Sequence, residues 1–164
     1  MENKMKTLLS VEEFLEIRKK IKEEGKKLVF TNGVFDIIHR GHIDYLNRAK
    51  ALGDYLVVAL NSDASVKRLK GEERPINNLD DRAFVVANLK AVDFVVSFDE
   101  DTPFEIISAI VPDVLVKGGD WQVDQIVGRD VVEANGGKVY SLPYVENYST
   151  TRIINKMKES GLEK

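Results

Sequence analysis

Apolar positions along this chain follow two patterns, short continuous runs and recurrences every three or four residues. The continuous runs, rich in branched and aromatic residues, predict buried strands over residues 27–32, 55–61, 93–97, 114–117 and 138–142. The helical recurrences predict helices over 11–24, 43–52, 64–69, 80–89, 103–110 and 124–134, and a last helix that begins at Ser149. Apolar strands that alternate with amphipathic helices indicate an α/β fold with a parallel sheet covered on both faces.

Residues that favour helix ends support several of these boundaries. Ser10 and Glu13 have the spacing of a capping box before the first helix. Thr102 and Glu105 predict an N-cap with a reciprocal carboxylate for the helix that ends near residue 110. Gly53 stands where a C′ glycine would close the second helix. No long linker, low-complexity tract or solenoid repeat interrupts the pattern, so we expect one domain.

Composition restricts the class of protein without identifying an activity. The 164 residues are 43% apolar and 31% charged with a net charge of −3, which is ordinary for a folded domain. The chain contains no cysteine, which excludes disulfides, thiolate metal sites and cysteine nucleophiles. Because no run resembles a membrane span or a signal peptide, we expect a cytoplasmic protein without a membrane partner. A pI near 5.5 argues against nucleic acid as a partner but permits a local phosphate pocket.

The densest chemical signal is the segment 31–42, TNGVFDIIHRGH, which joins the first strand to its helix and holds both histidines of the chain. Gly33 permits a tight exit from the strand, and Gly41 leaves room for a ligand to approach free backbone N–H groups. His39 and His42 are three residues apart and share one helix face, where two imidazoles suit phosphate oxygens. The structural alternative is a surface pair of histidines, and a zinc site would need a third ligand that the sequence does not supply nearby.

Two further segments are suited to anions. Residues 117–120, KGGD, place a lysine at the end of the fourth strand beside bare backbone, and residues 149–151, STT, place hydroxyls at a helix N-terminus. A solvated lysine and a plain helix cap are the alternatives, yet three such segments in one domain favour a phosphate ligand. The basic run 67–74 is either a solvated face or a flap that touches a triphosphate. The glycine signatures of dinucleotide-binding and P-loop proteins are absent.

Taken together, these segments resemble the HIGH-superfamily nucleotidyltransferases, whose HxGH signature is matched here by His39 to His42. The resemblance spans residues 27–158, and its KRLKG, VKGGD and STT segments are most similar to the D-glycero-β-D-manno-heptose 1-phosphate adenylyltransferase branch. It implies a Rossmann-like five-stranded parallel sheet in the order 3-2-1-4-5. We therefore expect a nucleotidyltransferase domain over 27–164, preceded by the N-terminal helix within residues 1–26 that the capping box and apolar spacing predict. Val34 stands where this branch often has cysteine. The kinase half of bifunctional members is missing, which implies a stand-alone adenylyltransferase.

The resemblance implies transfer of AMP from ATP to a sugar 1-phosphate, most closely D-glycero-β-D-manno-heptose 1-phosphate, giving ADP-heptose and pyrophosphate. One alternative is a cytidylyltransferase that acts on glycerol 3-phosphate or a related alcohol phosphate, and another is a nucleotide-binding module without catalysis. ATP and the sugar 1-phosphate are the expected partners, and Mg²⁺ is the expected cofactor, bound mainly through ATP phosphates. Relatives are commonly dimers, so a homodimer is one alternative, and the sequence leaves the oligomeric state open.

An in-line displacement of this kind needs positioning and charge stabilisation rather than a covalent nucleophile. His39, His42 and Lys117 are the predicted catalytic residues, through contacts with phosphate oxygens. Asp36 is predicted to orient the loop or the waters of the metal, and Asp120 to reach a ribose or sugar hydroxyl. The full set of predicted nucleotide and phosphate ligands is Thr31, Asn32, Gly33, Phe35, Asp36, Gly41, Lys70, Gly118, Asp120, Ser149, Thr150 and Thr151. No side chain is predicted to ligate a metal.

Overall fold

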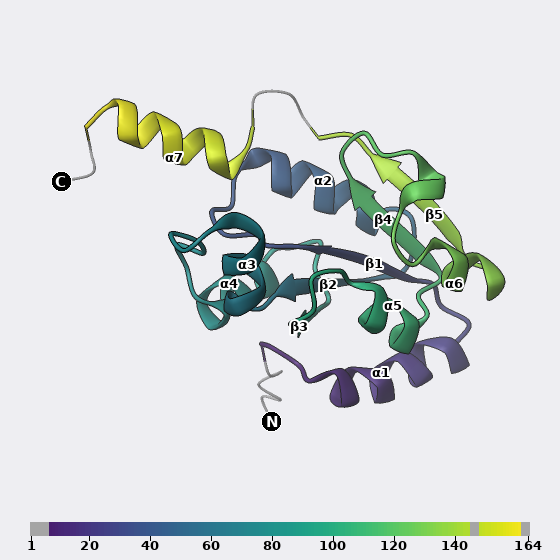
Figure 1. The fold of residues 1–164 in the computed structure, drawn as a ribbon. Coiled ribbons are helices and arrows are strands. Elements are labelled where there is room, and N and C mark those ends of the chain that lie inside the picture. The colour runs from purple at the N-terminus through teal and green to yellow at the C-terminus, as the bar shows by residue number, and fades with distance from the viewer. Residues whose placement is uncertain (1–6, 145–147, 162–164) are drawn as a thin grey trace.

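The computed structural model of this protein describes residues 7–144 and 148–161. Five parallel strands form one sheet in the order β3-β2-β1-β4-β5, which confirms the predicted α/β fold and strand order (Figure 1). The strands are β1 (Leu28–Gly33), β2 (Tyr55–Asn61), β3 (Phe94–Phe98), β4 (Val114–Gly118) and β5 (Lys138–Leu142). Each lies within two residues of the predicted bounds, because a short run of apolar residues rich in branched and aromatic side chains identifies a strand from local sequence alone.

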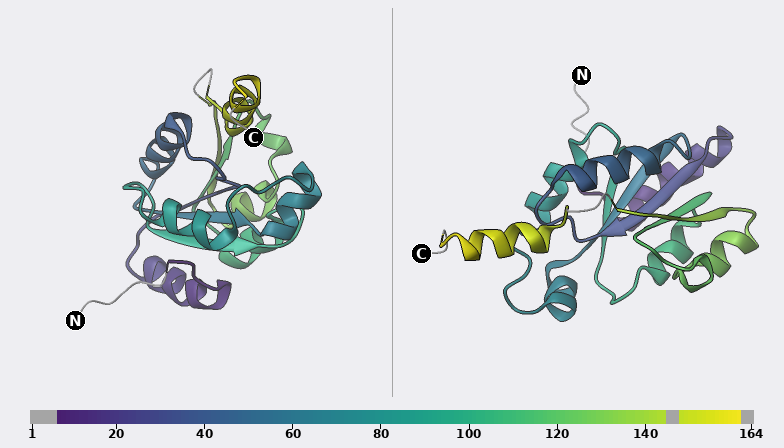
Figure 2. Two further views of the ribbon diagram at one scale, coloured as in Figure 1. Left: turned by 90° about the vertical axis from the view of Figure 1, so that its left-hand side faces the viewer. Right: turned by 90° about the horizontal axis from the view of Figure 1, so that it is seen from above.

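Helices cover both faces of the sheet. They are α1 (Val11–Glu23), α2 (Arg40–Lys50), α3 (Asp63–Lys70), α4 (Leu79–Ala87), α5 (Phe104–Ile110), α6 (Arg129–Ala134) and α7 (Thr150–Glu159), with a 3₁₀ turn η1 (Val123–Gln125). Helices α2 and α4 cover one face, and α1, α5 and α6 cover the other (Figures 1 and 2). Their buried side chains belong to two separate core clusters, one on each face. Helix α7 buries no residue and extends away from the body (Figure 2). In the part of the chain described here, no helix combines the length and hydrophobicity that crossing a bilayer requires.

The helix ends confirm one predicted signal and correct two others. The Ser10 and Glu13 capping box is present, with each side chain accepting the other residue's backbone N–H at 3.1 Å. The predicted N-cap at Thr102 is wrong, because α5 begins one residue later and has Pro103 at its N-cap position without a side-chain bond. Gly53 is not a C′ glycine either: its missing side chain lets β1 approach, since a Cβ there would lie 2.7 Å from Cγ2 of Val29.

The predicted helix over 124–134 is only partly correct. Residues 123–125 form the 3₁₀ turn, and the α-helix proper begins at Arg129. Gly128 separates the two with a φ of +89°, a left-handed conformation that interrupts a helix. A Cβ at Gly128 would also lie 2.8 Å from Cγ2 of Ile107, so this glycine is needed both for its backbone angle and for the packing of α5.

The sheet opens between the neighbouring strands β1 and β4. β1 pairs with β2 over six positions, up to Gly33 and Leu60, but with β4 only at Val29–Val114 and Phe30–Leu115. Beyond that point β1 and β4 carry no further paired positions. This is also where the strand order reverses, and ligands of α/β proteins bind beyond the strand ends at such a place.

Candidate active site

A cavity of about 560 Å³ lies where the carboxyl ends of β1 and β4 diverge. Residues from all three predicted anion-binding segments line it, although the first and last are more than a hundred positions apart in sequence. The predicted residues in its lining are Asn32, Gly33, Phe35, Asp36, His39, His42, Lys70, Lys117, Gly118, Ser149, Thr150 and Thr151. The fold therefore brings most of the predicted site to one place.

Three predicted ligands lie outside this lining. Thr31 is fully buried beneath it, with its Oγ1 2.5 Å from the hydroxyl of Tyr45. Asp120 is exposed on the surface beyond β4. The prediction for Gly41 needs correction, because its N–H is not free for a ligand: it donates to Nδ1 of His39 at 3.1 Å. A side chain at Gly41 would collide with that ring, since a Cβ would lie 2.9 Å from Cε1 of His39.

The two histidines cap the helix that carries them. His39 is the N-cap residue of α2, and its own backbone N–H donates to Nδ1 of His42 at 3.2 Å. The rings stack with their centroids 3.9 Å apart. A ring nitrogen that accepts a hydrogen bond carries no proton, so each neutral imidazole holds its proton on Nε2. Both rings line the cavity, and they offer it two neutral N–H donors.

Burial keeps both imidazoles neutral. It lowers the pKa of His42 to about 4, with the nearby His39 as a second cause, and it lowers the pKa of His39 as well. The ring of Phe35 contributes to this burial, because its centroid lies 5.1 Å from that of His42. Phe35 reaches this position from a left-handed backbone with φ of +51°, and Gly33 leaves room for its ring, which a Cβ would approach to 2.7 Å.

A lysine and two aromatic side chains line the cavity at the end of β4 and after β5. Lys117 is half-buried, its Nζ lies 5.3 Å from the centroid of the Trp121 ring, and burial lowers its pKa. Gly118 is bare because Tyr144 lies against it: a Cβ would be 2.5 Å from Cζ of that tyrosine. Tyr144 and Tyr148 were not predicted as lining residues. Their position after β5, at the carboxyl edge of the sheet, was the available signal.

The N-terminus of α7 lies beside that of α2. Ser149 is the N-cap of α7, and its Oγ accepts the N–H of Arg152 at 3.0 Å, as its prediction as a cap requires. The hydroxyl of Thr150 donates to the carbonyl of Ile37 at 2.9 Å, and so ties α7 to the loop that precedes the histidines. Two helix N-termini, each the positive end of a helix dipole, thus face one cavity, an arrangement that favours a polyanion.

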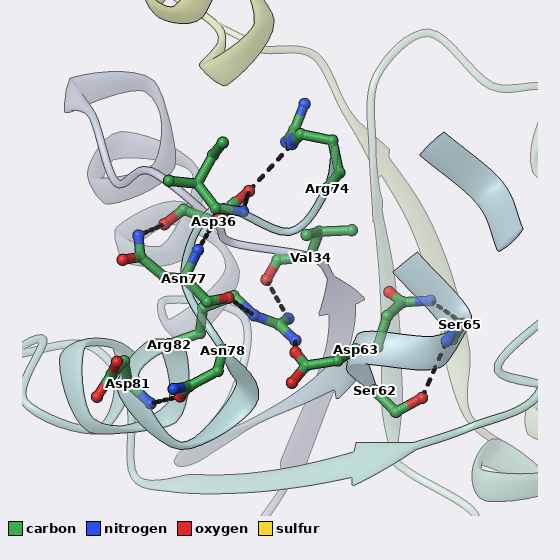
Figure 3. Close-up of polar contacts among 12 residues, drawn as sticks. Val34, Asp36, Ser62, Asp63, Ser65, Arg74, Asn77, Asn78, Asp81 and Arg82 are labelled. Atoms are coloured by element: carbon green, nitrogen blue, oxygen red, sulfur yellow. Dashed lines mark hydrogen bonds and ion pairs between the residues drawn. The ribbon is translucent and has the colours of Figure 1, made fainter. Parts of the chain in front are cut away.

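Asp36 holds the loop that contains Arg74, Ile76 and Asn77 (Figure 3). Its carboxylate is fully buried and accepts the backbone N–H groups of Ile76 and Asn77, each at 2.8 Å, and Nε of Arg74 at 3.0 Å. The loop that Asp36 holds is a second one, distant in sequence from the segment 31–42 in which Asp36 lies. The loop carries Arg74 into the lining of the cavity, where Lys70, at the end of α3, also lies.

Arg82 is a structural residue of this region that sequence reasoning missed. Its fully buried guanidinium donates to the carbonyls of Val34 and Asn77 at 2.9 and 3.0 Å, and to a carboxylate oxygen of Asp63 at 2.8 Å (Figure 3). It therefore joins the exit of β1, the loop held by Asp36, and the start of α3. Nothing near Arg82 in sequence identifies two of these partners, which lie 48 and 19 residues away.

Comparisons with known proteins identify the family of this chain. A family model described as cytidylyltransferase-like matches residues 30–156. The bifunctional protein HldE of Marinomonas sp. is 58% identical over 149 residues, which cover 91% of this chain and 31% of that protein. The bifunctional protein HldE of Klebsiella pneumoniae is 53% identical over 154 residues, which cover 94% of this chain and 32% of the relative. This chain thus spans about a third of the length of these relatives.

Two solved structures share the fold. The lipopolysaccharide core biosynthesis protein from Thermoplasma volcanium matches with a TM-score of 0.61 and 32% sequence identity, over 76% of this chain and 100% of that one. The pantoate-beta-alanine ligase from Francisella tularensis, solved in complex with beta-gamma ATP and beta-alanine, matches with a TM-score of 0.58 over 96% of this chain and 79% of that one. At 16% identity the second match supports the fold alone.

Proposed function

This chain belongs to the cytidylyltransferase-like family, and from that premise we propose that it transfers AMP from ATP to a sugar 1-phosphate with release of pyrophosphate. The observation that carries the proposal is the cavity in which both neutral histidines, Lys117 and the N-terminus of α7 meet. Identities above 50% with bifunctional HldE proteins support this branch of the family. The proposed acceptor is D-glycero-β-D-manno-heptose 1-phosphate, and it rests on the resemblance of the KRLKG, VKGGD and STT segments.

In the proposed reaction an oxygen of the sugar phosphate attacks the α-phosphorus of ATP in line, and the bond to the β-phosphate oxygen breaks. His39 and His42 donate their Nε2 protons as hydrogen bonds to the phosphate oxygens on which charge develops. Lys117 supplies a positive charge beside the transferred group. The hydroxyls and N–H groups at the start of α7 hold the β- and γ-phosphates, so that pyrophosphate leaves from a fixed position. Nothing in this sequence of events requires a covalent nucleophile.

Mg²⁺ is proposed as the cofactor, held chiefly by ATP phosphates. Within residues 7–144 and 148–161, no three histidine or carboxylate side chains gather where they could hold a metal. Asp36, the acidic side chain predicted to orient the waters of the metal, already accepts N–H groups on both carboxylate oxygens. A cavity lined in this way suits an ion that keeps its waters and binds mainly through substrate oxygens, as Mg²⁺ commonly does. When bound, the ion would supply positive charge to the phosphates.

The experiment that tests the proposal is pyrophosphate release in Mg²⁺ buffer, with ATP or CTP crossed against both anomers of D-glycero-D-manno-heptose 1-phosphate and against glycerol 3-phosphate. We expect release with ATP and the β-anomer. Release only with CTP or with glycerol 3-phosphate would support the cytidylyltransferase alternative, and ATP binding without release from any pair would support the non-catalytic one. The His39→Ala, His42→Ala double variant controls for contaminating activity. The homodimer stays an alternative, which sedimentation velocity would test.

Replacing Gly41 with alanine is expected to lower kcat about tenfold, because displacing a catalytic group by a fraction of an ångström to an ångström has effects of this size or larger. The new Cβ would lie 2.9 Å from Cε1 of His39 and 3.0 Å from Cβ of Tyr148, so the His39 ring must move. Thermal unfolding should change little, since alanine favours the first helical turn more than glycine does. In a His39→Ala background the same substitution should have no further effect on kcat, and an additive loss there would contradict this account.

A further inference from the structure

A tyrosine hydroxyl occupies the point where the sheet opens. The last paired position of β1 and β4 is Phe30 with Leu115, so Thr31 and Val116 would form the next one. Instead, the hydroxyl of Tyr45 lies 2.5 Å from Oγ1 of Thr31 and donates to the carbonyl of Val116 at 3.3 Å. Because Tyr45 gives its single proton to Val116, Thr31 is the donor of the other bond. A chain of two hydrogen bonds thus replaces direct contact between the strands.

The position of Tyr45 relates this bridge to the active site. On α2, Tyr45 comes three residues after His42, so both side chains lie on the same face of the helix. On β4, its acceptor Val116 directly precedes Lys117. Tyr45 is only 2% exposed, yet its ring forms part of the cavity lining. One side chain therefore connects the helix that carries the histidine to the strand that carries the lysine.

We propose that Tyr45 is a positioning residue, whose hydroxyl separates β1 from β4 and fixes the distance between His42 and Lys117. This inference rests on the proposed function for its kinetic consequences. Without the hydroxyl, the buried oxygens of Thr31 and Val116 lose their partner, and an unpaired buried polar group is unfavourable enough that the strands or a water must move to satisfy them. Any such movement changes the width of the cavity between the two catalytic groups.

The bridge also explains why Thr31 lies away from the ligand side of the cavity. As a predicted nucleotide ligand it would have pointed into the cavity, but its hydroxyl is fully buried against Tyr45. Burial raises the pKa of the Tyr45 phenol well above its ordinary value, so the hydroxyl keeps its proton and remains a donor at neutral pH. Thr31 and Tyr45 thus form a single unit, and removing either hydroxyl should have the same consequence.

The test compares kinetics across five variants. Tyr45→Phe and Thr31→Val each remove one hydroxyl, and we expect kcat to fall about tenfold while KM for ATP stays within about twofold, as for a misaligned rather than a missing contact. The double variant should lose no more than either single variant. Thr31→Ser retains the hydroxyl and should restore most of kcat. Tyr55→Phe, a half-buried tyrosine on β2 with no part in the cavity lining, is the matched control and should keep wild-type kinetics.

A second readout does not depend on activity. Trp121 is the only tryptophan of the chain, and its ring faces Nζ of Lys117, so its fluorescence reports on the exit of β4. Tyr45→Phe should shift the emission of Trp121 without substrate, and Tyr55→Phe should not. Two results would overturn the proposal. A Tyr45→Phe protein with lowered thermal stability but unchanged kcat and unchanged emission would show that Tyr45 contributes only to packing. A raised KM for ATP at constant kcat would show that Tyr45 contacts the nucleotide. A wild-type protein inactive on every substrate pair would reject the proposed function, while the emission shift would still decide the role of Tyr45.

Discussion

Replacing His42 with alanine is expected to lower kcat by a factor of about 10³ without unfolding the protein. His42 is the more buried of the two histidines that line the cavity, and its Nε2–H is a fixed donor to charge that develops on a phosphate oxygen. Removing one preorganised donor of this kind from an active site lowers kcat by about 10²–10³. Steady-state pyrophosphate release would measure the loss, and circular dichroism at increasing temperature would verify the fold.

A second substitution separates catalysis from helix capping. Nδ1 of His42 accepts the backbone N–H of His39, a role that glutamine fills at the same position of ordinary capping boxes. His42→Gln should therefore keep more of the thermal stability than His42→Ala, yet lose a comparable share of kcat. Turnover close to the wild-type rate in a folded His42→Ala protein would contradict the proposed role of this residue.

The same residue gives a pH dependence of stability. Burial lowers the pKa of His42 to about 4 in the folded chain, whereas an unfolded histidine titrates near 6.5. Between these values the unfolded state binds more protons, so the free energy of unfolding should decrease as pH falls from about 6.5 towards 4, and this contribution is fully present above 6.5. Urea denaturation at pH 5 and pH 7 should show a smaller difference in His42→Gln than in wild type. Equal differences in the two proteins would mean that other groups cause the acid sensitivity.

Much of the fold could be predicted because the relevant signals are local. Four of the five strands are short apolar runs that are mostly buried, and Ser10 and Ser149 are capping residues whose partner N–H groups lie three positions ahead. Two helix-end predictions were wrong because another feature of the fold explains the same residue. Pro103 occupies the N-cap position for which Thr102 was predicted, and Gly53 is small because a neighbouring strand approaches it, rather than because a helix ends there.

The candidate site could be predicted in its segments but not in its connections. Parallel strands bring their carboxyl ends to one edge, which is why residues after β1, β4 and β5 line one cavity. The hydrogen bonds of Asp36 to residues 74–77, and of Tyr45 to Val116, join positions 38 to 71 residues apart. No spacing rule reports such contacts, because they depend on how loops pack once the sheet has formed. The consequence is that residues which position the site are harder to identify from sequence than residues which line it.

Arg82 is the clearest case of a positioning residue without a local signal, and replacing it with leucine is expected to lower the free energy of unfolding by about 3 kcal/mol. The substitution leaves the carbonyls of Val34 and Asn77 without their buried donor, and each such loss contributes roughly 1–3 kcal/mol. Asp63 contributes less, because its side chain is 42% exposed and water can replace the arginine. For a chain of this size, the melting temperature should fall by about 10 °C.

The matched control is Arg68→Leu, which removes an arginine whose ion pair with Asp101 is solvated on both sides and whose bond to the carbonyl of Asp99 is also exposed. Exposed pairs of this kind contribute at most about 1 kcal/mol, so the control should melt within a few degrees of wild type. Arg82→Lys keeps the positive charge but cannot reach three acceptors in one plane, and it should fall between the two. If Arg82→Leu melted like the control, the loop that carries Arg74 would have to be held by Asp36 alone. The three segments that Arg82 joins would then be stable without a common donor.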